Sequence, residues 1–184
     1  MRQAAVERNT NETNVRVSLA IDGAGKTDIN TGVGFLDHML ALFAAHGQFD
    51  LSVFCKGYLY VDCHHSVEDV GIALGQALLQ AAGDKRGIAR YGNITLPMDE
   101  ALVSVCLDFS GRPYLVYNVD LPSPSVGNFD TETVEDFFRA VAVNAGLTLH
   151  INMVYGKNTH HIIEACFKAF GRTLSAALKV DPEI

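Results

Sequence analysis

Hydrophobic positions follow two spacings along this chain, one typical of strands and one typical of helices. In residues 14–21, valine, leucine and isoleucine occupy every second position, which indicates a strand with one buried face. Five further segments are predicted to be strands, namely residues 50–55, 58–61, 102–107, 114–119 and 148–154. Four segments with apolar stripes at helical spacing are predicted to be helices, namely residues 35–45, 67–82, 131–145 and 160–178. Strands and helices therefore alternate, which indicates an α/β class of fold.

Turn and cap residues separate these elements. Gly83 follows the second predicted helix, at the position where glycine commonly ends helices. Asp130 or Thr131 is predicted to cap the third helix through its side-chain oxygen. Residues 120–127, which contain two prolines, are predicted to be a loop. The chain is thus expected to consist of short elements with distinct ends.

One motif occurs twice. The pentapeptide HHxxE begins at His64 and again at His160, and each copy opens an apolar helical run. The pattern of strands and helices before the first copy is repeated before the second. The chain is therefore interpreted as a duplicated half, with residues 1–95 as the first half-repeat, residues 96–184 as the second, and the two together as one compact unit. Duplication of this kind predicts pseudo-two-fold packing, with sheets outside and helices between them.

Alignment of the two copies pairs further polar residues. Glu12 aligns with Glu100, and each opens a strand. His38 falls opposite Asp136 when the intervening hairpin is counted with a two-residue gap. His38 and Asp136 are therefore predicted to occupy equivalent helices ahead of the HHxxE helices. Asp99 and Glu100 could be catalytic carboxylates, but both are interpreted as structural, because Glu100 starts a strand and no histidine lies near them in the sequence.

The spacing within HHxxE suits metal coordination. Each residue of an α-helix turns about 100°, so the glutamate can share an ion with the first histidine while the second histidine points toward another ion. With the two aligned residues added, the candidate ligands are His38, His64, His65, Glu68, Asp136, His160, His161 and Glu164. Imidazole and carboxylate donors without thiolate suit Mn(II), Zn(II) or Fe(II), and carboxylate-rich octahedral sites favour Mn(II).

Composition excludes several classes of protein. The 184 residues suit one domain or two small fused halves, and a hydrophobic content of 48% suffices for a sizeable core. The net charge of −7 argues against coating nucleic acid, and no window approaches the roughly 20 apolar residues of a membrane span. The polar N-terminus shows no secretory signal. The four scattered cysteines lack a CxxC motif, so we expect them to be reduced and the protein to be cytoplasmic.

A series of short segments resembles the imidazoleglycerol-phosphate dehydratase family almost from end to end. The segments are RNTNET (8–13), TGVGFLDHML (31–40), HHSVED (64–69), RYG (90–92), PMDEA (97–101), SGRP (110–113), GKNTHHIIEA (156–165) and FKAF (167–170). Each segment alone is weakly specific. In this order and spacing, their combination is highly specific for the family.

The resemblance implies a duplicated fold in which helices pack between two four-stranded sheets. It also implies an enzyme of histidine biosynthesis, a lyase that dehydrates D-erythro-imidazole glycerol 3-phosphate to imidazole acetol phosphate with two Mn(II) ions per active site. The implied assembly is a homo-oligomer, a 24-mer of trimers whose sites lie between subunits. These properties are expectations that follow from the family match alone.

The resemblance also implies roles for individual residues. The implied metal ligands are His38, His64, His65, Glu68, His160, His161 and Glu164. Arg90, Arg112 and Lys168 match positions that hold the substrate, mainly its phosphate. Glu12 matches a carboxylate that contacts the substrate. In a chain with net negative charge, these cations are expected to grip the anionic group locally.

The sequence departs from the family pattern in two places that affect the site. Asp136 stands where many members have a metal-binding histidine, and its carboxylate can still act as a ligand. The sequence ends at Ile184, before a Ser-x-Lys-Gly tail that members commonly use to bind phosphate. Phosphate binding is therefore expected to depend on the two arginines and the lysine named above.

The implied reaction breaks a C–H bond that is not acidic, because no carbonyl group flanks it. Coordination of both imidazole nitrogens by metal would make the ring imidazolate-like, so that electron density can expel the hydroxyl group. The candidate catalytic carboxylates are Glu12, Glu68 and Glu164. Glu12 or Glu164 would transfer the protons, and a metal-bound glutamate is the poorer base of the two.

Other interpretations remain open from the residues alone. The HHxxE residues could be surface or capping residues at two helix starts, but their repetition in equivalent positions disfavours this. A di-metal hydrolase would use the same ligands to generate a metal-bound hydroxide. A non-catalytic assembly would use them only to cross-link subunits. Hydrolysis without dehydration would favour the hydrolase, and alanine variants of the cations without any effect would favour the non-catalytic assembly.

Overall fold

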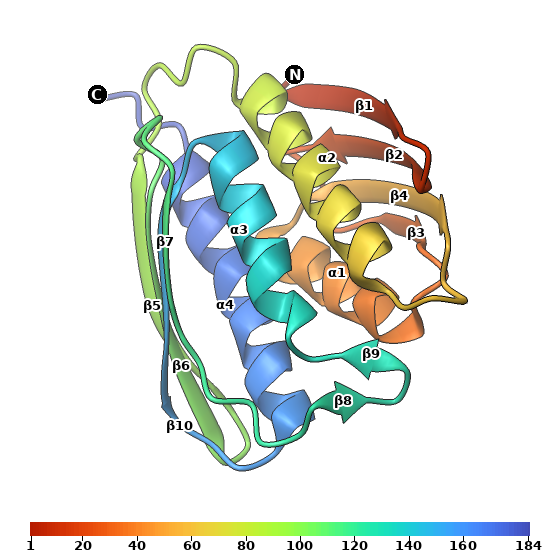
Figure 1. The fold of residues 1–184 in the computed structure, drawn as a ribbon. Helices are drawn as coiled ribbons and strands as arrows, with labels where there is room; N and C mark the ends of the chain where they lie inside the picture. Colours follow the sequence, from red (N-terminus) through yellow and green to blue (C-terminus); the bar gives the residue numbers. More distant parts are fainter.

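The computed structural model describes residues 1–184, which form two outer sheets with helices between them (Figure 1). The first sheet contains, in spatial order, β1 (Gln3–Asn9), β2 (Thr13–Ala20), β4 (Asp50–Gly57) and β3 (Thr27–Asn30). The second contains β5 (Tyr91–Met98), β6 (Ala101–Asp108), β10 (Thr148–Tyr155) and β7 (Tyr114–Asn118). The four helices are α1 (Gly34–Gly47), α2 (His64–Ala82), α3 (Thr133–Ala145) and α4 (Thr159–Leu178). A short hairpin of β8 (Ser125–Val126) and β9 (Phe129–Asp130) precedes α3.

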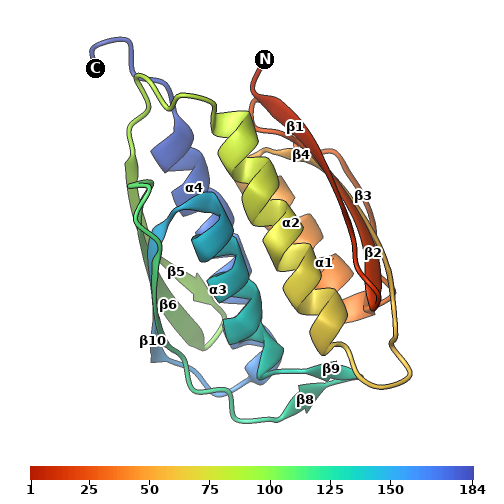
Figure 2. The ribbon, with the colours of Figure 1, turned by 45° about the horizontal axis from the view of Figure 1, so that its top comes forward.

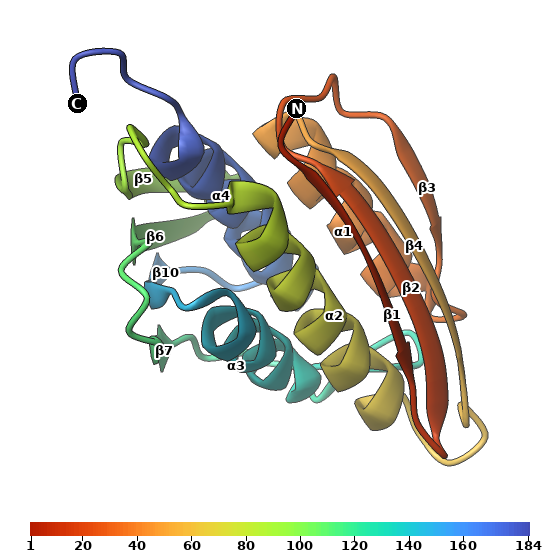
Figure 3. The same cartoon turned by 90° about the horizontal axis from the view of Figure 1, so that it is seen from above.

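The two halves repeat the same topology. In each sheet the first three strands pair antiparallel and the fourth pairs parallel to the third. Each half also contributes two helices in equivalent places, and Figure 3 shows the helix layers facing one another between the sheets. The predicted duplicated fold, with helices between two four-stranded sheets, is therefore confirmed. The predicted change of half between residues 95 and 96 falls within β5, which already belongs to the second sheet.

Several local predictions were incomplete or wrong. Residues 58–61, predicted to be a strand, form turns instead, in which the Val61 amide donates to the Tyr58 carbonyl. Their aromatic and branched side chains suit a strand, but no neighbouring strand forms backbone hydrogen bonds with them. The third helix begins at Thr133 and has no side-chain cap, so the predicted cap from Asp130 or Thr131 was wrong. The Thr133 hydroxyl instead donates back to the carbonyl of Asp130.

The helices pair across the two halves rather than within them. The helix α1 packs along α4, and α2 packs along α3 (Figure 2). Glycines permit the close approach, since a Cβ at Gly171 of α4 would lie 2.5 Å from the Phe43 carbonyl oxygen of α1. A Cβ at Gly75 of α2 would likewise lie 2.8 Å from the Val141 carbonyl oxygen of α3. This pairing determines which helices can contribute to one site.

A phenylalanine cluster holds this helix layer together. The Phe43 and Phe170 rings stack at 5.3 Å between α1 and α4, and Phe138 of α3 contacts both Phe167 and Phe170 of α4. All four side chains are almost fully buried. Close-packed aromatic groups resist displacement, so the polar residues one or two turns away project from a rigid support.

No helix combines the length and the apolar composition that a membrane span requires.

Candidate active site

The two HHxxE motifs lie at the same end of the helix layer. In Figure 1 the N-termini of α2 and α4 both point toward the lower end of the molecule, where α1 and α3 also begin. Helix N-termini carry unpaired amide groups and a partial positive charge. The duplicated fold therefore gathers two sets of histidines and carboxylates at one end.

The first set, the α1–α4 cluster, consists of His38, His160 and Glu164. One ligand atom from each of these residues lies within 4.8 Å of the others. Glu164 Oε1 lies 3.3 Å from His160 Nε2 and 3.6 Å from His38 Nε2. The i, i+4 spacing puts His160 and Glu164 on one face of α4, and the pairing of α1 with α4 supplies His38. The cluster has the composition of a three-ligand metal site.

Glu164 is a buried carboxylate supported by a lysine. Its side chain is only 8% exposed, and its Oε2 lies 2.8 Å from Lys168 Nζ, one turn further along α4. Burial alone would raise the pKa of Glu164, but Lys168 and His160 outweigh burial and lower it. Glu164 is therefore ionised at neutral pH, as a metal ligand must be. Lys168 also contacts Met98 Sδ at 3.5 Å, which fixes its direction.

The second set, the α2–α3 cluster, consists of His64 with Asp62, Asp130, Glu132 and Asp136. His64 Nε2 lies 3.5 Å from Glu132 and 3.7 Å from Asp136. Asp136 thus approaches His64 as His38 approaches His160, across the same kind of helix pair. His64 Nδ1 is buried without a hydrogen bond, and its closest carboxylate is that of Asp62 at 3.4 Å.

His161 belongs to neither cluster, because it turns toward the β5–β6 hairpin. Its Nδ1 lies 2.5 Å from Glu100 Oε1, and its Nε2 lies 3.6 Å from Asp99 Oδ2. The hydrogen bond from His161, followed by those from the amides of Lys157 and Asn158, lowers the pKa of Glu100 to about 2. The same contact raises the pKa of His161.

Three of the predicted metal-binding and catalytic residues have no side-chain partner within the chain. His65 and Glu68 are exposed on α2, and the side chain of neither makes a hydrogen bond or ion pair. Glu12 is exposed in the hairpin between β1 and β2. This hairpin adjoins α2 near its first turns, since the Thr13 hydroxyl donates to Asp69. All three side chains are therefore available to groups from outside the chain.

Arg90 and Arg112 lie at the opposite end of the molecule from the two histidine clusters. The Arg90 amide donates to the Ala177 carbonyl near the end of α4, and the loop of Arg112 contacts Gly146 at the end of α3. The eight residues of β5 separate Arg90 from the Asp99 turn, which corresponds to roughly 26 Å of strand. One chain therefore cannot bring these arginines to its own clusters.

Arg90 is held in an unusual conformation. Its φ of 74° lies in the left-handed region, which side-chain-bearing residues rarely adopt. Arg90 Nε donates to Asp108 Oδ1 at 2.7 Å, and its guanidinium lies 5.1 Å from the centre of the Tyr91 ring. Strained backbone of this kind persists where surrounding contacts enforce it, and it is frequent at functional sites.

The residues of the two clusters suit divalent metal ions. The donors are imidazole nitrogens and carboxylate oxygens, and the orphaned Nδ1 of His64 is a buried nitrogen with no partner of its own. His38 and His160 are 53% and 43% exposed, so the α1–α4 cluster lies open at the end of a single chain. Further ligands are therefore able to approach from solvent or from another molecule.

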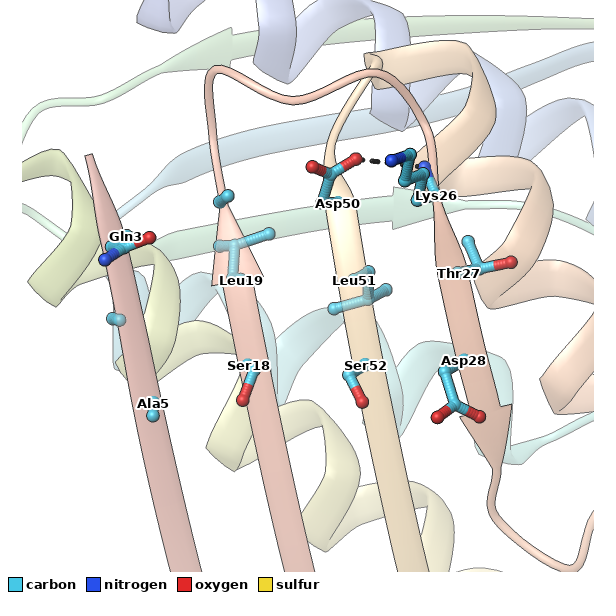
Figure 4. Close-up of a pocket in the computed structure, with 12 residues that line it drawn as sticks. Gln3, Ala5, Ser18, Leu19, Lys26, Thr27, Asp28, Asp50, Leu51 and Ser52 are labelled. Atoms are coloured by element: carbon cyan, nitrogen blue, oxygen red, sulfur yellow. Dashed lines mark hydrogen bonds between the residues drawn. The ribbon is translucent and has the colours of Figure 1, made fainter. Parts of the chain in front are cut away.

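The hollow shown in Figure 4 lies elsewhere. It has a volume of about 610 Å³ over the outer face of the first sheet, where Ala5, Ser18 and Ser52 form a floor of small side chains. Asp50 closes its upper end by accepting hydrogen bonds from the amides of Ala24 and Lys26. No histidine lines it. It therefore plays no part in the candidate active site.

Sequence reasoning missed several residues near the histidines. Glu100 was interpreted as structural, yet it contacts His161 directly. Its alignment with Glu12 was the signal that could have assigned it to the site. Asp62 and Asp130, which come within 4.8 Å of His64, follow no repeated pattern and gave no such signal.

The fold and the clusters define the class of this protein as a duplicated α+β enzyme with candidate metal sites at one end of its helix layer. The family model for imidazoleglycerol-phosphate dehydratase matches residues 31–174. The chain belongs to the imidazoleglycerol-phosphate dehydratase family, and it is accordingly a dehydratase of histidine biosynthesis. The enzyme class and the family predicted from the sequence are thereby confirmed.

Relatives and solved structures agree along nearly the whole chain. The imidazoleglycerol-phosphate dehydratase of Caldanaerobacter subterraneus subsp. tengcongensis is 61% identical over 184 residues, which cover 100% of this chain and 95% of that protein. The crystal structure of the enzyme from Staphylococcus aureus has a TM-score of 0.89 at 47% identity and covers 97% of this chain and 99% of that one. A structure of the Pyrococcus furiosus enzyme in complex with (S)-C348 has a TM-score of 0.84 at 35% identity. That match covers 96% of this chain and 95% of the other.

Proposed function

We propose that this enzyme dehydrates D-erythro-imidazole glycerol 3-phosphate to imidazole acetol phosphate with two Mn(II) ions at each active site. The observation that carries the proposal is the α1–α4 cluster, where two imidazoles converge on one buried, ionised carboxylate. The proposed ligands are His38, His64, His65, Glu68, Asp136, His160, His161 and Glu164. This donor set suits Mn(II), although Zn(II) and Fe(II) accept the same donors.

The surroundings of each candidate carboxylate indicate its role in the proposed chemistry. Bound cations would supply Lewis-acid polarisation of the imidazole ring of the substrate, which favours its imidazolate form. Glu164 is engaged with His160, His38 and Lys168, so its role is to hold charge in place. Glu12 has an exposed side chain without any hydrogen bond, so its carboxylate is free to move a proton. Glu68 is exposed on α2 and is the remaining candidate.

The phosphate is proposed to be gripped by Lys168, Arg90 and Arg112. Lys168 contacts Glu164 of the α1–α4 cluster, whereas Arg90 is separated from the Asp99 turn by the whole of β5, roughly 26 Å of strand. Arg112 lies at the same far end of the chain's fold, beside the end of α3. A substrate of this size cannot span that separation. The arginines must therefore come from another copy, which supports the proposal of a homo-oligomer with shared sites, specifically a 24-mer of trimers.

The first experiment is metal analysis of the purified protein, followed by a dehydratase assay with and without Mn(II). We expect bound divalent metal, and dehydration that is lost on metal removal and restored by Mn(II). Hydrolysis of a phosphorylated substrate without any dehydration would instead identify a di-metal hydrolase. A protein that binds no metal and still dehydrates the substrate would contradict the proposed site.

Metal removal is also expected to change the assembly. His38 and His160 are half exposed at the end of the helix layer, so the α1–α4 cluster is open to a neighbouring subunit. We therefore propose that the ions join ligands from different subunits. Stripping the metal with a chelator should release smaller oligomers, which we expect to be trimers. Light scattering after size-exclusion chromatography measures the particle mass. A particle of unchanged mass after complete metal removal would argue that the ions are not shared.

A cytoplasmic location is part of the same proposal. All four cysteines are free thiols, and Cys55, Cys63 and Cys166 are buried in the core without a disulfide. Free buried thiols suit a reducing compartment. The net charge of −7 and the small phosphorylated substrate suit an enzyme that acts on neither nucleic acid nor membrane.

A further inference from the structure

Two carboxylates that duplication made equivalent differ in their surroundings. Glu12 lies in the β1–β2 hairpin of the first half, and Glu100 lies in the β5–β6 hairpin of the second. Each hairpin adjoins the start of an HHxxE helix. The Glu12 side chain makes no hydrogen bond or ion pair, whereas Glu100 is fully engaged. The two halves therefore use the same position in different ways.

Glu100 is held by groups that fix the role of each of its oxygens. Oε2 accepts hydrogen bonds from the amides of Lys157 and Asn158, at 2.9 Å and 3.0 Å, directly before α4. Oε1 lies 2.5 Å from His161 Nδ1. The side-chain oxygen of Asn158 in turn accepts a hydrogen bond from the His161 amide. The first turn of α4 is therefore anchored both by Glu100 and by its own cap residue.

This arrangement selects one form of the imidazole. Because an ionised carboxylate only accepts hydrogen bonds, the proton that lies between Glu100 and His161 belongs to Nδ1. In the neutral ring the lone pair is then on Nε2, the atom available to a cation. Nε2 lies 3.6 Å from the nearest oxygen of Asp99, which is beyond hydrogen-bond distance.

We infer that Glu100 is a positioning residue, which holds the proton of His161 on Nδ1 and directs Nε2 toward a bound metal ion. This inference rests on the proposed function, in which His161 is a ligand. Carboxylates that hold the far nitrogen of a ligating histidine fix both the ring orientation and its tautomer. The duplicated carboxylates have thus diverged, since Glu100 orients a ligand while Glu12 remains free for proton transfer.

A purely structural role for Glu100 would consist of closing the loop before α4, and glutamine distinguishes the two roles. In Glu100→Gln the amide oxygen must face the two backbone N–H groups, because its NH2 group cannot accept from them. The NH2 group then faces His161 Nδ1 and forces the proton onto Nε2, which blocks coordination. Loop closure is preserved, but the ligand is lost. In Glu100→Ala both loop bonds are lost, but the His161 ring can still adopt the ligating tautomer.

The test measures Mn(II) affinity by electron paramagnetic resonance titration of the metal-stripped protein, with circular dichroism as a check of folding. We expect Glu100→Gln to weaken Mn(II) binding by about 10–100-fold, and at least as strongly as Glu100→Ala. Glu12→Gln, the matched change in the other hairpin, should leave Mn(II) affinity unchanged. Wild-type affinity in Glu100→Gln, or a loss smaller than that in Glu100→Ala, would overturn the inference.

A fourth variant separates this inference from the proposed function. Replacing the ligand itself, His161→Gln, should weaken Mn(II) binding at least as much as Glu100→Gln. If His161→Gln binds Mn(II) like the wild type, His161 is not a ligand and the proposed ligand set is wrong. If only the His161 variant loses metal, the ligand set stands and the role assigned to Glu100 is wrong.

Discussion

Glu12→Gln is expected to lower kcat by about 10²–10⁴-fold, the range typical of a lost general acid or base. Its exposed carboxylate makes no hydrogen bond or ion pair, unlike that of Glu164, which contacts Lys168 and His160. Glutamine preserves the size of the side chain but cannot accept and return a proton. Steady-state dehydratase assays on metal-loaded protein measure the change in kcat, and metal content should equal that of the wild type.

A matched variant controls for the change of charge near the hairpin. Glu7 lies on the exposed face of β1 and its side chain accepts a hydrogen bond only from Asn9, so Glu7→Gln should retain the kcat of the wild type. Glu164→Gln provides the opposite comparison, because it should lose metal together with activity. A Glu12→Gln enzyme with the kcat of the wild type would exclude Glu12 from proton transfer and leave Glu68 as the carboxylate to test.

Mixed assemblies are expected to recover activity from two inactive subunits. Arg112→Ala should raise KM by about 30-fold or more, since it removes a charged contact to phosphate. His160→Ala should abolish turnover by disrupting the α1–α4 cluster. When the two variants are co-assembled at equal amounts, random pairing gives about a quarter of the sites an intact cluster from one subunit and an intact arginine from its neighbour. Dehydratase activity at limiting substrate measures this recovery.

The control mixture combines two defects in the same cluster. His160 and Glu164 lie on one helix turn of one chain, so no pairing of His160→Ala with Glu164→Gln subunits restores a complete α1–α4 cluster. That mixture should remain inactive. If the Arg112→Ala and His160→Ala mixture is equally inactive, the arginine and the cluster do not meet at one site, and the argument from their separation along β5 fails.

The internal repeat predicted more of the fold than the individual strands did. Alternating Val15, Val17 and Leu19 identified β2, because a strand with one buried face leaves a period of two. The strands β1 and β5 were not predicted, since they lie at sheet edges and carry few fully buried residues. The short strand β3 was missed for the same reason. The duplication made up for these missed strands, because two equivalent halves are expected to share one topology.

The sequence by itself determined the local part of the site. The HHxxE spacing puts His160 and Glu164 on one helix face and turns His161 away, because helix geometry depends only on separation along the chain. The motifs and their order also determined the family. These features required no knowledge of how the helices pack.

Only the tertiary structure decided which distant groups meet. Packing between segments remote in sequence pairs α1 with α4 and so brings His38 to Glu164. The same packing places Glu100 against His161 and Arg90 at the far end of the molecule. Close approach at Gly171 and the buried phenylalanines determine that packing. Local spacing does not encode such contacts, because they depend on the shape of the whole core.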